Sequence, residues 1–191
     1  MLVYQQCLRM WPDPVLIQFK VVNPDTTLET EWYATYNTLP SHIFKPKDRF
    51  GVSPQYSLLE SREAIDFMTI YIMERKHQPV FILEIKPHPN LVNISRRMGE
   101  HVQSCQCFEK LRCVIVIPRL HVMSAMGTTF ALYKLDKPSK CMTPAEISST
   151  DEQLIQDTVP QSWWKYNILE PARIAKLLKI SEDVKVMCLN I

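Results

Sequence analysis

The stretch that most constrains the fold is IDFMTIYIMERKHQPVFILEIK, residues 65–86. Two runs within it, residues 65–73 and 79–85, consist mainly of β-branched, aromatic and other apolar side chains. A charged segment, residues 74–78, separates them and leads into a proline. Apolar runs of this length around a polar turn predict two paired strands.

The second run carries charged side chains near its end. Because side chains alternate across a strand, Glu84 and Lys86 are expected on one face, together with Val80 and Ile82. Charged groups are rarely buried without a partner or a metal ion. The carboxylate and the ammonium in this strand are therefore expected to have a specific role.

One such reason is hydrolysis of a phosphodiester with the help of a divalent metal. Asp66 and Glu84 can supply hard oxygen ligands to Mg²⁺ (or Mn²⁺), and the backbone carbonyl of Ile85 can add a third. Lys86 would orient or deprotonate the attacking water, or neutralise the charge that develops on the phosphate.

These residues resemble the signature of the PD-(D/E)xK nuclease superfamily. In that signature an acidic residue begins one strand and (D/E)-x-K lies on the next, which matches Asp66 and the run Glu84-Ile85-Lys86. One departure is Ile65, which replaces the proline before the aspartate. Residues 29–37, 61–67, 83–87 and 124–128 are also similar to fungal proteins regarded as PD-(D/E)xK-like.

The resemblance implies a restriction-endonuclease-like fold and metal-dependent nuclease activity. It also implies an extra glutamate on the helix before the strand pair, a role that we assign to Glu31 first and to Glu29 second. A capping box between Thr26 and Glu29 predicts that this helix runs to about Leu39 and stops at Pro40. Helical spacing puts Glu31 on or beside the buried face, although it could equally border the core and point to water.

A second helix is expected from residue 93 or 95 to residue 111. Its predicted buried stripe consists of Met98, Val102, Cys105 and Phe108. In the resembled superfamily this helix brings a glutamine or a basic residue to the substrate. The candidates here are Arg97, Gln103 and Gln106. The alternative is an ordinary amphipathic helix.

The other expected elements complete an α/β fold (α+β, with a mixed sheet and helices on both sides). The expected strands are residues 53–59, 113–117, 120–124 and 129–135, and a helix is expected from residue 171 to about residue 179. Residues 15–22 could form an edge strand or a packing arm. We expect one domain over residues 1–191, with its core in residues 24–135 and a helical, aromatic extension in residues 136–191.

Composition narrows the function further. A net charge of +2 is only mildly basic, so affinity for nucleic acid would need a local basic patch. With three glycines the sequence contains neither a P-loop nor a dinucleotide-binding fingerprint. His101, Cys105, Cys107 and Cys113 could bind zinc, but residues two apart on a helix face different directions.

Two classes of function remain open. The first is a Mg²⁺-dependent nuclease that acts on DNA in preference to RNA, and a homodimer is one of the forms in which we expect it to act. The second is an inactive nuclease fold that serves as an interaction module through its aromatic C-terminal region, which includes Trp163 and Trp164. Residues 1–10 lack a long apolar run and the cysteines lack a disulfide-rich spacing, so we expect an intracellular protein, nuclear or cytoplasmic, without a membrane span.

Overall fold

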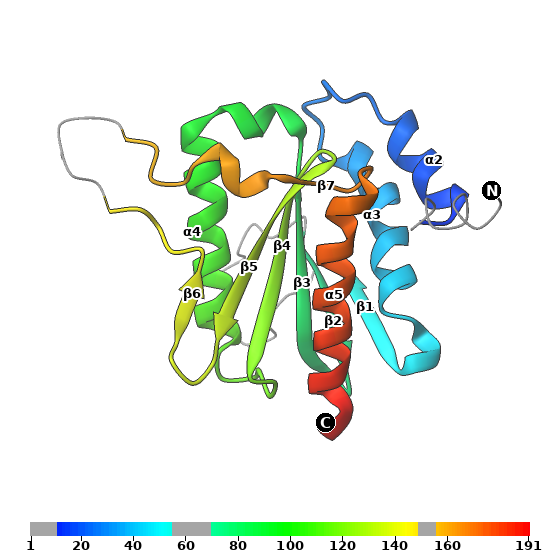
Figure 1. The fold of residues 1–191 in the computed structure, drawn as a ribbon, viewed down its shortest axis with the longest axis vertical. Coiled ribbons are helices and arrows are strands. Elements are labelled where there is room, and N and C mark those ends of the chain that lie inside the picture. The colour runs from blue at the N-terminus through cyan, green and yellow to red at the C-terminus, as the bar shows by residue number, and fades with distance from the viewer. Residues whose placement is uncertain (1–10, 55–69, 149–155) are drawn as a thin grey trace.

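The computed structural model describes residues 11–54, 70–148 and 156–191. A mixed β-sheet forms its centre and helices cover both faces, so the expected α/β class is confirmed (Figure 1). The helices are α2 (Asp13–Val21), α3 (Thr30–Ile43), α4 (Ile94–Leu111) and α5 (Pro171–Met187). None of the helices in these ranges is long and apolar enough to cross a membrane.

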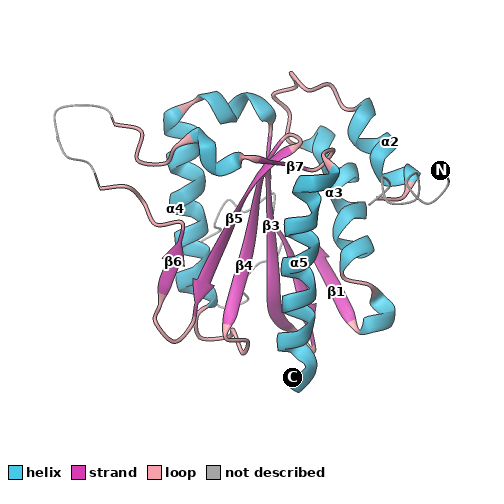
Figure 2. Ribbon diagram, viewed as in Figure 1, coloured by secondary structure: helices cyan, strands magenta, loops and turns pink. Residues whose placement is uncertain are grey.

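The described part of the sheet has seven strands. They are β1 (Phe50–Pro54), β2 (Ile70–Arg75), β3 (Gln78–Lys86), β4 (Arg119–Met126), β5 (Thr129–Asp136), β6 (Cys141–Thr143) and β7 (Tyr166–Asn167). The order is β1-β2-β3-β4-β5-β6, with β7 also paired to β5 (Figure 2). Among the strand pairs of the described residues only β3–β4 is parallel, and α4 supplies the crossover connection that parallel neighbours require.

The predicted strand pair forms the antiparallel hairpin β2–β3. The strands reach further into the charged segment than expected, and only Lys76 and His77 make the turn. Both have positive φ, 50° and 62°, as the favoured two-residue hairpin turns require. Residues 65–69, which include the expected start of the first strand, lie outside the described residues.

The two faces of β3 pack against different helices. Leu83 packs with Leu39 of α3 and Leu177 of α5 around a small gap on one face. On the opposite face Glu84 accepts a hydrogen bond from Ser104 of α4. Thus α3 and α5 cover one side of the sheet and α4 covers the other (Figure 1).

Two segments expected to be extended strands differ in the structure. Residues 15–22 form most of α2, in which Val15 and Phe19 are buried one turn apart. Residues 113–117 form a turn and a connection that buries Ile115 and Ile117 without joining the sheet. A short apolar run fits a helix or a packed loop as well as a strand, and periodicity alone does not separate them.

Three predicted boundaries also change. The capping box is absent because Thr26 Oγ1 accepts from the Leu28 amide, 3.1 Å away, and α3 begins only at Thr30. That helix continues through Pro40 to Ile43. The helix α5 extends to Met187 instead of stopping near residue 179. The predicted strand at residues 53–59 overlaps the end of β1 at residues 53–54, and its residues 55–59 lie outside the described residues.

Gly127 fixes the turn between β4 and β5 beside the end of β3. Its φ is 61°, its amide donates to the Lys86 carbonyl at 2.9 Å, and its carbonyl accepts from the Tyr36 hydroxyl at 2.6 Å. A Cβ at this position would lie 2.6 Å from the Cβ of His88. The position therefore requires glycine for both its backbone angle and its close packing.

We expect Gly127→Ala to lower the free energy of unfolding by about 1–3 kcal/mol, because alanine is strained at positive φ and would displace His88. Gly99→Ala is the matched control: Gly99 lies within α4, a Cβ there meets nothing within 4 Å, and the change should stabilise by about 0.5–1 kcal/mol. Urea unfolding of both variants measures the difference. Equal effects of the two substitutions would contradict the assigned role of Gly127.

Candidate functional site

A cluster of charged side chains lies at the end of β3, between the sheet and α4. It consists of Glu84 and Lys86 of β3, Glu100 of α4 and Glu29 just before α3. Glu84 and Lys86 both face α4, as their alternation along the strand predicts. Three carboxyl groups thus surround one ammonium group.

Glu84 is 1% exposed and is therefore almost completely removed from water. Its Oε2 atom accepts a hydrogen bond from Ser104 Oγ at 3.3 Å. Its Oε1 atom accepts no hydrogen bond from an N–H or hydroxyl group of the described residues, and the carboxyl group of Glu100 lies close enough to form a hydrogen bond with that of Glu84. An unpaired carboxylate oxygen in the interior is costly, so this position needs a proton or a cation for full stabilisation.

Glu100 is the residue that the sequence analysis missed. It is 5% exposed, its Oε1 atom lies 4.0 Å from Lys86 Nζ, and its carboxyl group lies within hydrogen-bonding reach of that of Glu84. Of the predicted buried stripe of α4, Phe108 is buried, Met98 and Cys105 are half-buried, and Val102 is 48% exposed. The actual buried positions are Arg97, Glu100, His101, Ser104, Cys107, Phe108 and Leu111. Counting back from Leu111 in steps of three and four would have placed Glu100 toward the sheet.

Glu29 occupies the position that was expected for Glu31. Its Oε1 atom lies 3.1 Å from Lys86 Nζ, whereas Glu31 is exposed. Of the two alternatives for Glu31, the structure shows the second, because α3 begins at Thr30 and the Glu31 side chain is exposed to solvent. Glu29 has no capping role, so its carboxylate is available to Lys86.

The two inner carboxyl groups influence each other strongly. Burial raises the pKa of Glu84, although Lys86 and hydrogen bonds oppose this effect. Burial and the adjacent Glu84 raise the pKa of Glu100. The pair is therefore not fully ionised at neutral pH in the absence of a bound cation.

Lys86 experiences opposing effects. Burial alone would lower its pKa, but the carboxyl groups of Glu100, Glu29 and Glu84 together raise it above the usual value. The side chain is 13% exposed and remains an ammonium group at neutral pH. It can neutralise negative charge, but it holds its proton too firmly to act as a base in this arrangement.

The donor set fits a hard divalent cation in part. Glu84 and Glu100 each have a buried oxygen that accepts no hydrogen bond from an N–H or hydroxyl group of the described residues, and carboxylate oxygens are the ligands that Mg²⁺ prefers. Ile85, whose carbonyl is a predicted ligand, lies between Glu84 and Lys86 in β3. Asp66, the predicted first acid, lies outside the described residues. Within residues 11–54, 70–148 and 156–191, no group of three His, Cys, Asp or Glu side chains converges as a metal site.

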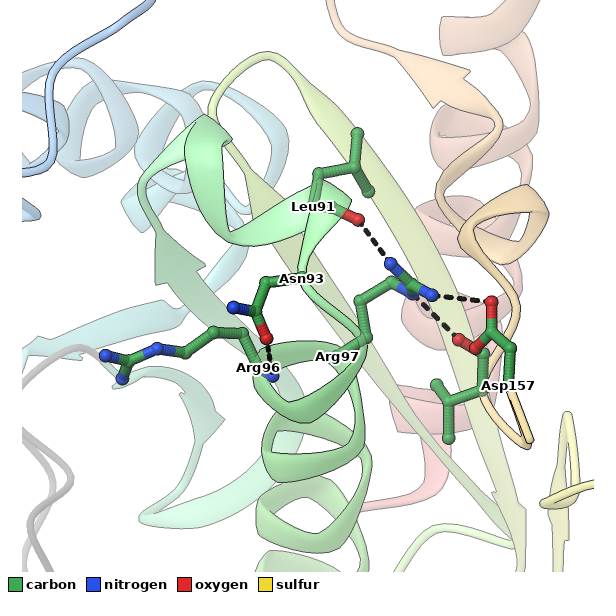
Figure 3. A network of polar contacts seen from close by, with 6 residues as sticks. Leu91, Asn93, Arg96, Arg97 and Asp157 are labelled. Atoms are coloured by element: carbon green, nitrogen blue, oxygen red, sulfur yellow. Dashed lines mark hydrogen bonds and ion pairs between the residues drawn. The ribbon is translucent and has the colours of Figure 1, made fainter. Parts of the chain in front are cut away.

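Arg97, a predicted substrate-binding residue, has a structural position instead. It is 3% exposed, and it donates to the carbonyls of Leu91 at 2.7 Å and Val159 at 2.9 Å. Its Nη2 atom pairs with Asp157 Oδ2 at 2.5 Å (Figure 3). The contacts with Val159 and Asp157 tie α4 to the C-terminal segment, and the contact with Leu91 ties it to the turn before the helix, so Arg97 cannot reach a substrate without breaking them.

The other two substrate-binding candidates are on α4 with different exposure. Gln103 is half-buried and Gln106 is exposed. The four predicted zinc ligands do not form one group. Cys105 Sγ lies 3.6 Å from His101 Nε2, whereas Cys107 is buried and Cys113 is exposed beyond the end of α4.

Comparison with known proteins gave no matching family model, no matching curated protein and no matching solved structure. The chemistry of the site therefore rests on its own geometry. Its defining features are the two buried carboxyl groups of Glu84 and Glu100 and the ammonium group of Lys86 beside them.

The buried carboxyl pair predicts an unusual dependence of stability on pH. Because folding raises the pKa of Glu84 and Glu100 above the ordinary value of 4.5, the folded protein binds more protons than the unfolded chain at higher pH. Their stabilising effect is present below pH 4.5 and is lost as the pH rises through the folded-state values. We expect Glu100→Gln to reduce this loss and to be more stable than the parent at pH 8 by roughly 1–2 kcal/mol.

Urea unfolding between pH 5 and pH 9 tests this expectation. Glu109→Gln is the matched control, because Glu109 is an exposed residue of the same helix. An unchanged pH dependence in Glu100→Gln would show that the carboxyl pair does not set it.

Neighbouring arginines of α4 give a second stability prediction. Arg97→Met keeps the apolar stem but removes the donors to the Leu91 and Val159 carbonyls, so it should cost about 2–4 kcal/mol. Arg96 is the control: it is exposed and extends away from Arg97 in Figure 3, so Arg96→Met should change stability little. Thermal unfolding of the two variants checks this contrast, and a small effect of Arg97→Met would refute the tethering role.

Proposed function

We propose that this protein is a divalent-metal-dependent nuclease that hydrolyses phosphodiester bonds of nucleic acid, with DNA favoured over RNA. The observation that carries this proposal is the buried pair Glu84 and Glu100, whose carboxyl groups lie within hydrogen-bonding reach of each other and in which Glu84 Oε1 and Glu100 Oε2 accept no hydrogen bond from the N–H or hydroxyl groups of the described residues. Lys86, an ammonium group, lies 4.0 Å from Glu100. Carboxylates that bind a metal next to a fixed cation form a site suited to the charge of a phosphodiester.

The order of the elements supports a restriction-endonuclease-like fold as part of this proposal. A helix preceded by a glutamate, α3, comes before the strand pair β2–β3, which ends in Glu84-Ile85-Lys86. The helix α4 follows and packs against that end of the strand pair. The sheet is mixed and has helices on both faces, as the resemblance to PD-(D/E)xK nucleases implies.

Each residue of the site has a proposed role. Glu84 and Glu100 would hold Mg²⁺ (or Mn²⁺), with Asp66 and the Ile85 carbonyl as further oxygen donors. The metal ion would activate a water molecule and neutralise phosphate charge. Lys86 is better suited to stabilising the negative charge of the transition state than to removing a proton, because its pKa is raised. Glu29 would hold Lys86 in place through their ion pair.

The second candidate function is an interaction module with this fold and without catalysis. The observation that favours it is the ion pair between Lys86 and Glu29, which gives the ammonium group a carboxylate partner within the chain itself. Trp164 is 3% exposed, so it contributes to the core and cannot stack on a partner. An interaction surface would therefore need residues other than this tryptophan.

Incubation with single- and double-stranded DNA and RNA, in Mg²⁺, Mn²⁺ or EDTA, tests the proposal. We expect metal-dependent cleavage that Glu84→Gln, Glu100→Gln and Lys86→Ala each reduce by about 100-fold or more, because each group acts on developing charge. Glu109→Gln and Lys20→Ala are the controls, since both residues are exposed. Cleavage that persists in EDTA or in Lys86→Ala would overturn this mechanism, and no cleavage by the folded protein would favour the interaction module.

A further inference from the structure

Three side chains with soft or borderline metal-ligand atoms meet between α4 and β6, in a cluster separate from Glu84 and Lys86. Cys105 Sγ lies 3.6 Å from His101 Nε2 and 3.8 Å from Met142 Sδ. His101 and Cys105 are one helical turn apart on α4, and Met142 is the central residue of β6. Thus the Cys105 thiol lies close both to the imidazole of its own helix and to the thioether of β6.

The spacing of these atoms matches the ligands of one metal ion. Sulfur and imidazole nitrogen typically bind at about 2.3 Å and 2.0 Å. At a tetrahedral angle, a sulfur and a nitrogen bound to one ion are then about 3.5 Å apart, and two sulfurs are about 3.8 Å apart. The observed separations of 3.6 Å and 3.8 Å agree with these values, so a metal ion could bind here with little movement of Cys105.

The ligand types favour a soft cation. Thiolate and thioether sulfur select Cu(I), whereas Mg²⁺ and Ca²⁺ require oxygen ligands. A thioether adds little to a zinc site, which ordinarily uses cysteine, histidine or carboxylate ligands. We propose that His101, Cys105 and Met142 form a binding site for Cu(I).

The surrounding structure orients the ligands and leaves a path to them. The His101 ring packs against Tyr133 and Trp163, each with a centroid 5.7 Å away, which restricts its rotation. Cys105 and Met142 are half-buried, so an ion can approach their sulfur atoms from solvent. Pairing of β6 with β5 fixes the position of Met142 relative to α4.

Binding requires one proton to leave. The Cys105 thiol transfers its proton to water, and its thiolate, the Met142 thioether and the neutral His101 imidazole each donate an electron pair to Cu(I). Copper keeps its oxidation state in this step. The proposal is independent of nuclease activity, because none of the three residues belongs to the Glu84, Glu100 and Lys86 cluster.

Anaerobic titration of the full chain with Cu(I), in competition with a chromophoric Cu(I) chelator, tests the site. Methyl NMR provides a second readout, because the chain has nine methionines and only the Met142 methyl group should shift strongly with the first equivalent. We expect Met142→Leu and Cys105→Ser each to weaken the tightest Cu(I) binding at least about tenfold.

Cys113→Ser is the matched control, since Cys113 is exposed and lies outside the cluster. Met142→Leu preserves an apolar side chain, and a circular dichroism spectrum equal to that of the parent shows that the variant is folded. The proposal is overturned if Met142→Leu retains the parent affinity, if Cys113→Ser loses as much affinity as Cys105→Ser, or if a methionine other than Met142 shifts first.

Discussion

The burial of Glu84 and Glu100 against each other is the interaction on which the rest of this structure depends. Two acids that share a nearly water-free space at the end of β3 cannot both be ionised without a compensating charge. Lys86 supplies part of that charge, and Glu29 holds Lys86 from the opposite side. Glu84 Oε1 and Glu100 Oε2 accept no hydrogen bond from the N–H or hydroxyl groups of the described residues, so the compensation is incomplete. Proteins retain such an unfavourable arrangement mainly where it serves a site, and a divalent cation would complete the charge balance.

The helix α4 connects this arrangement to the rest of the molecule through three groups of residues. Glu100 and Ser104 face the end of β3, while His101 and Cys105 lie toward β5 and β6. Near its beginning, Arg97 binds the segment that includes Asp157 and Val159. A shift of α4 along the sheet would therefore alter all three groups together. The helix behaves as a single structural support for contacts that come from distant parts of the sequence.

The parts of the fold that the sequence predicts best are those with a strong local pattern. The hairpin β2–β3 combines two apolar runs with a charged turn. Because side chains alternate along β3, the face of the strand that carries Glu84 could also be predicted. The position of Glu29 could not be predicted in this way, because a local hydrogen bond from Leu28 to Thr26 delays the start of α3. Glu100 was missed, and Arg97 was expected to contact substrate, for a different reason. Both residues are charged, yet both lie on the buried stripe of α4. Burial of a charged side chain depends on partners from other elements, which a single helical pattern does not contain.

The parallel pairing of β3 with β4 has a kinetic consequence for the charge cluster. The carboxyl groups cannot meet until α4 has formed and packed on the sheet, and β4 cannot pair with β3 until the chain has returned along that crossover. Closing a connection of this length costs chain entropy before any contact compensates for it. Glu84 therefore stays accessible to water until α4 packs on the sheet. A cation that binds the completed cluster would stabilise the folded state chiefly by slowing its unfolding.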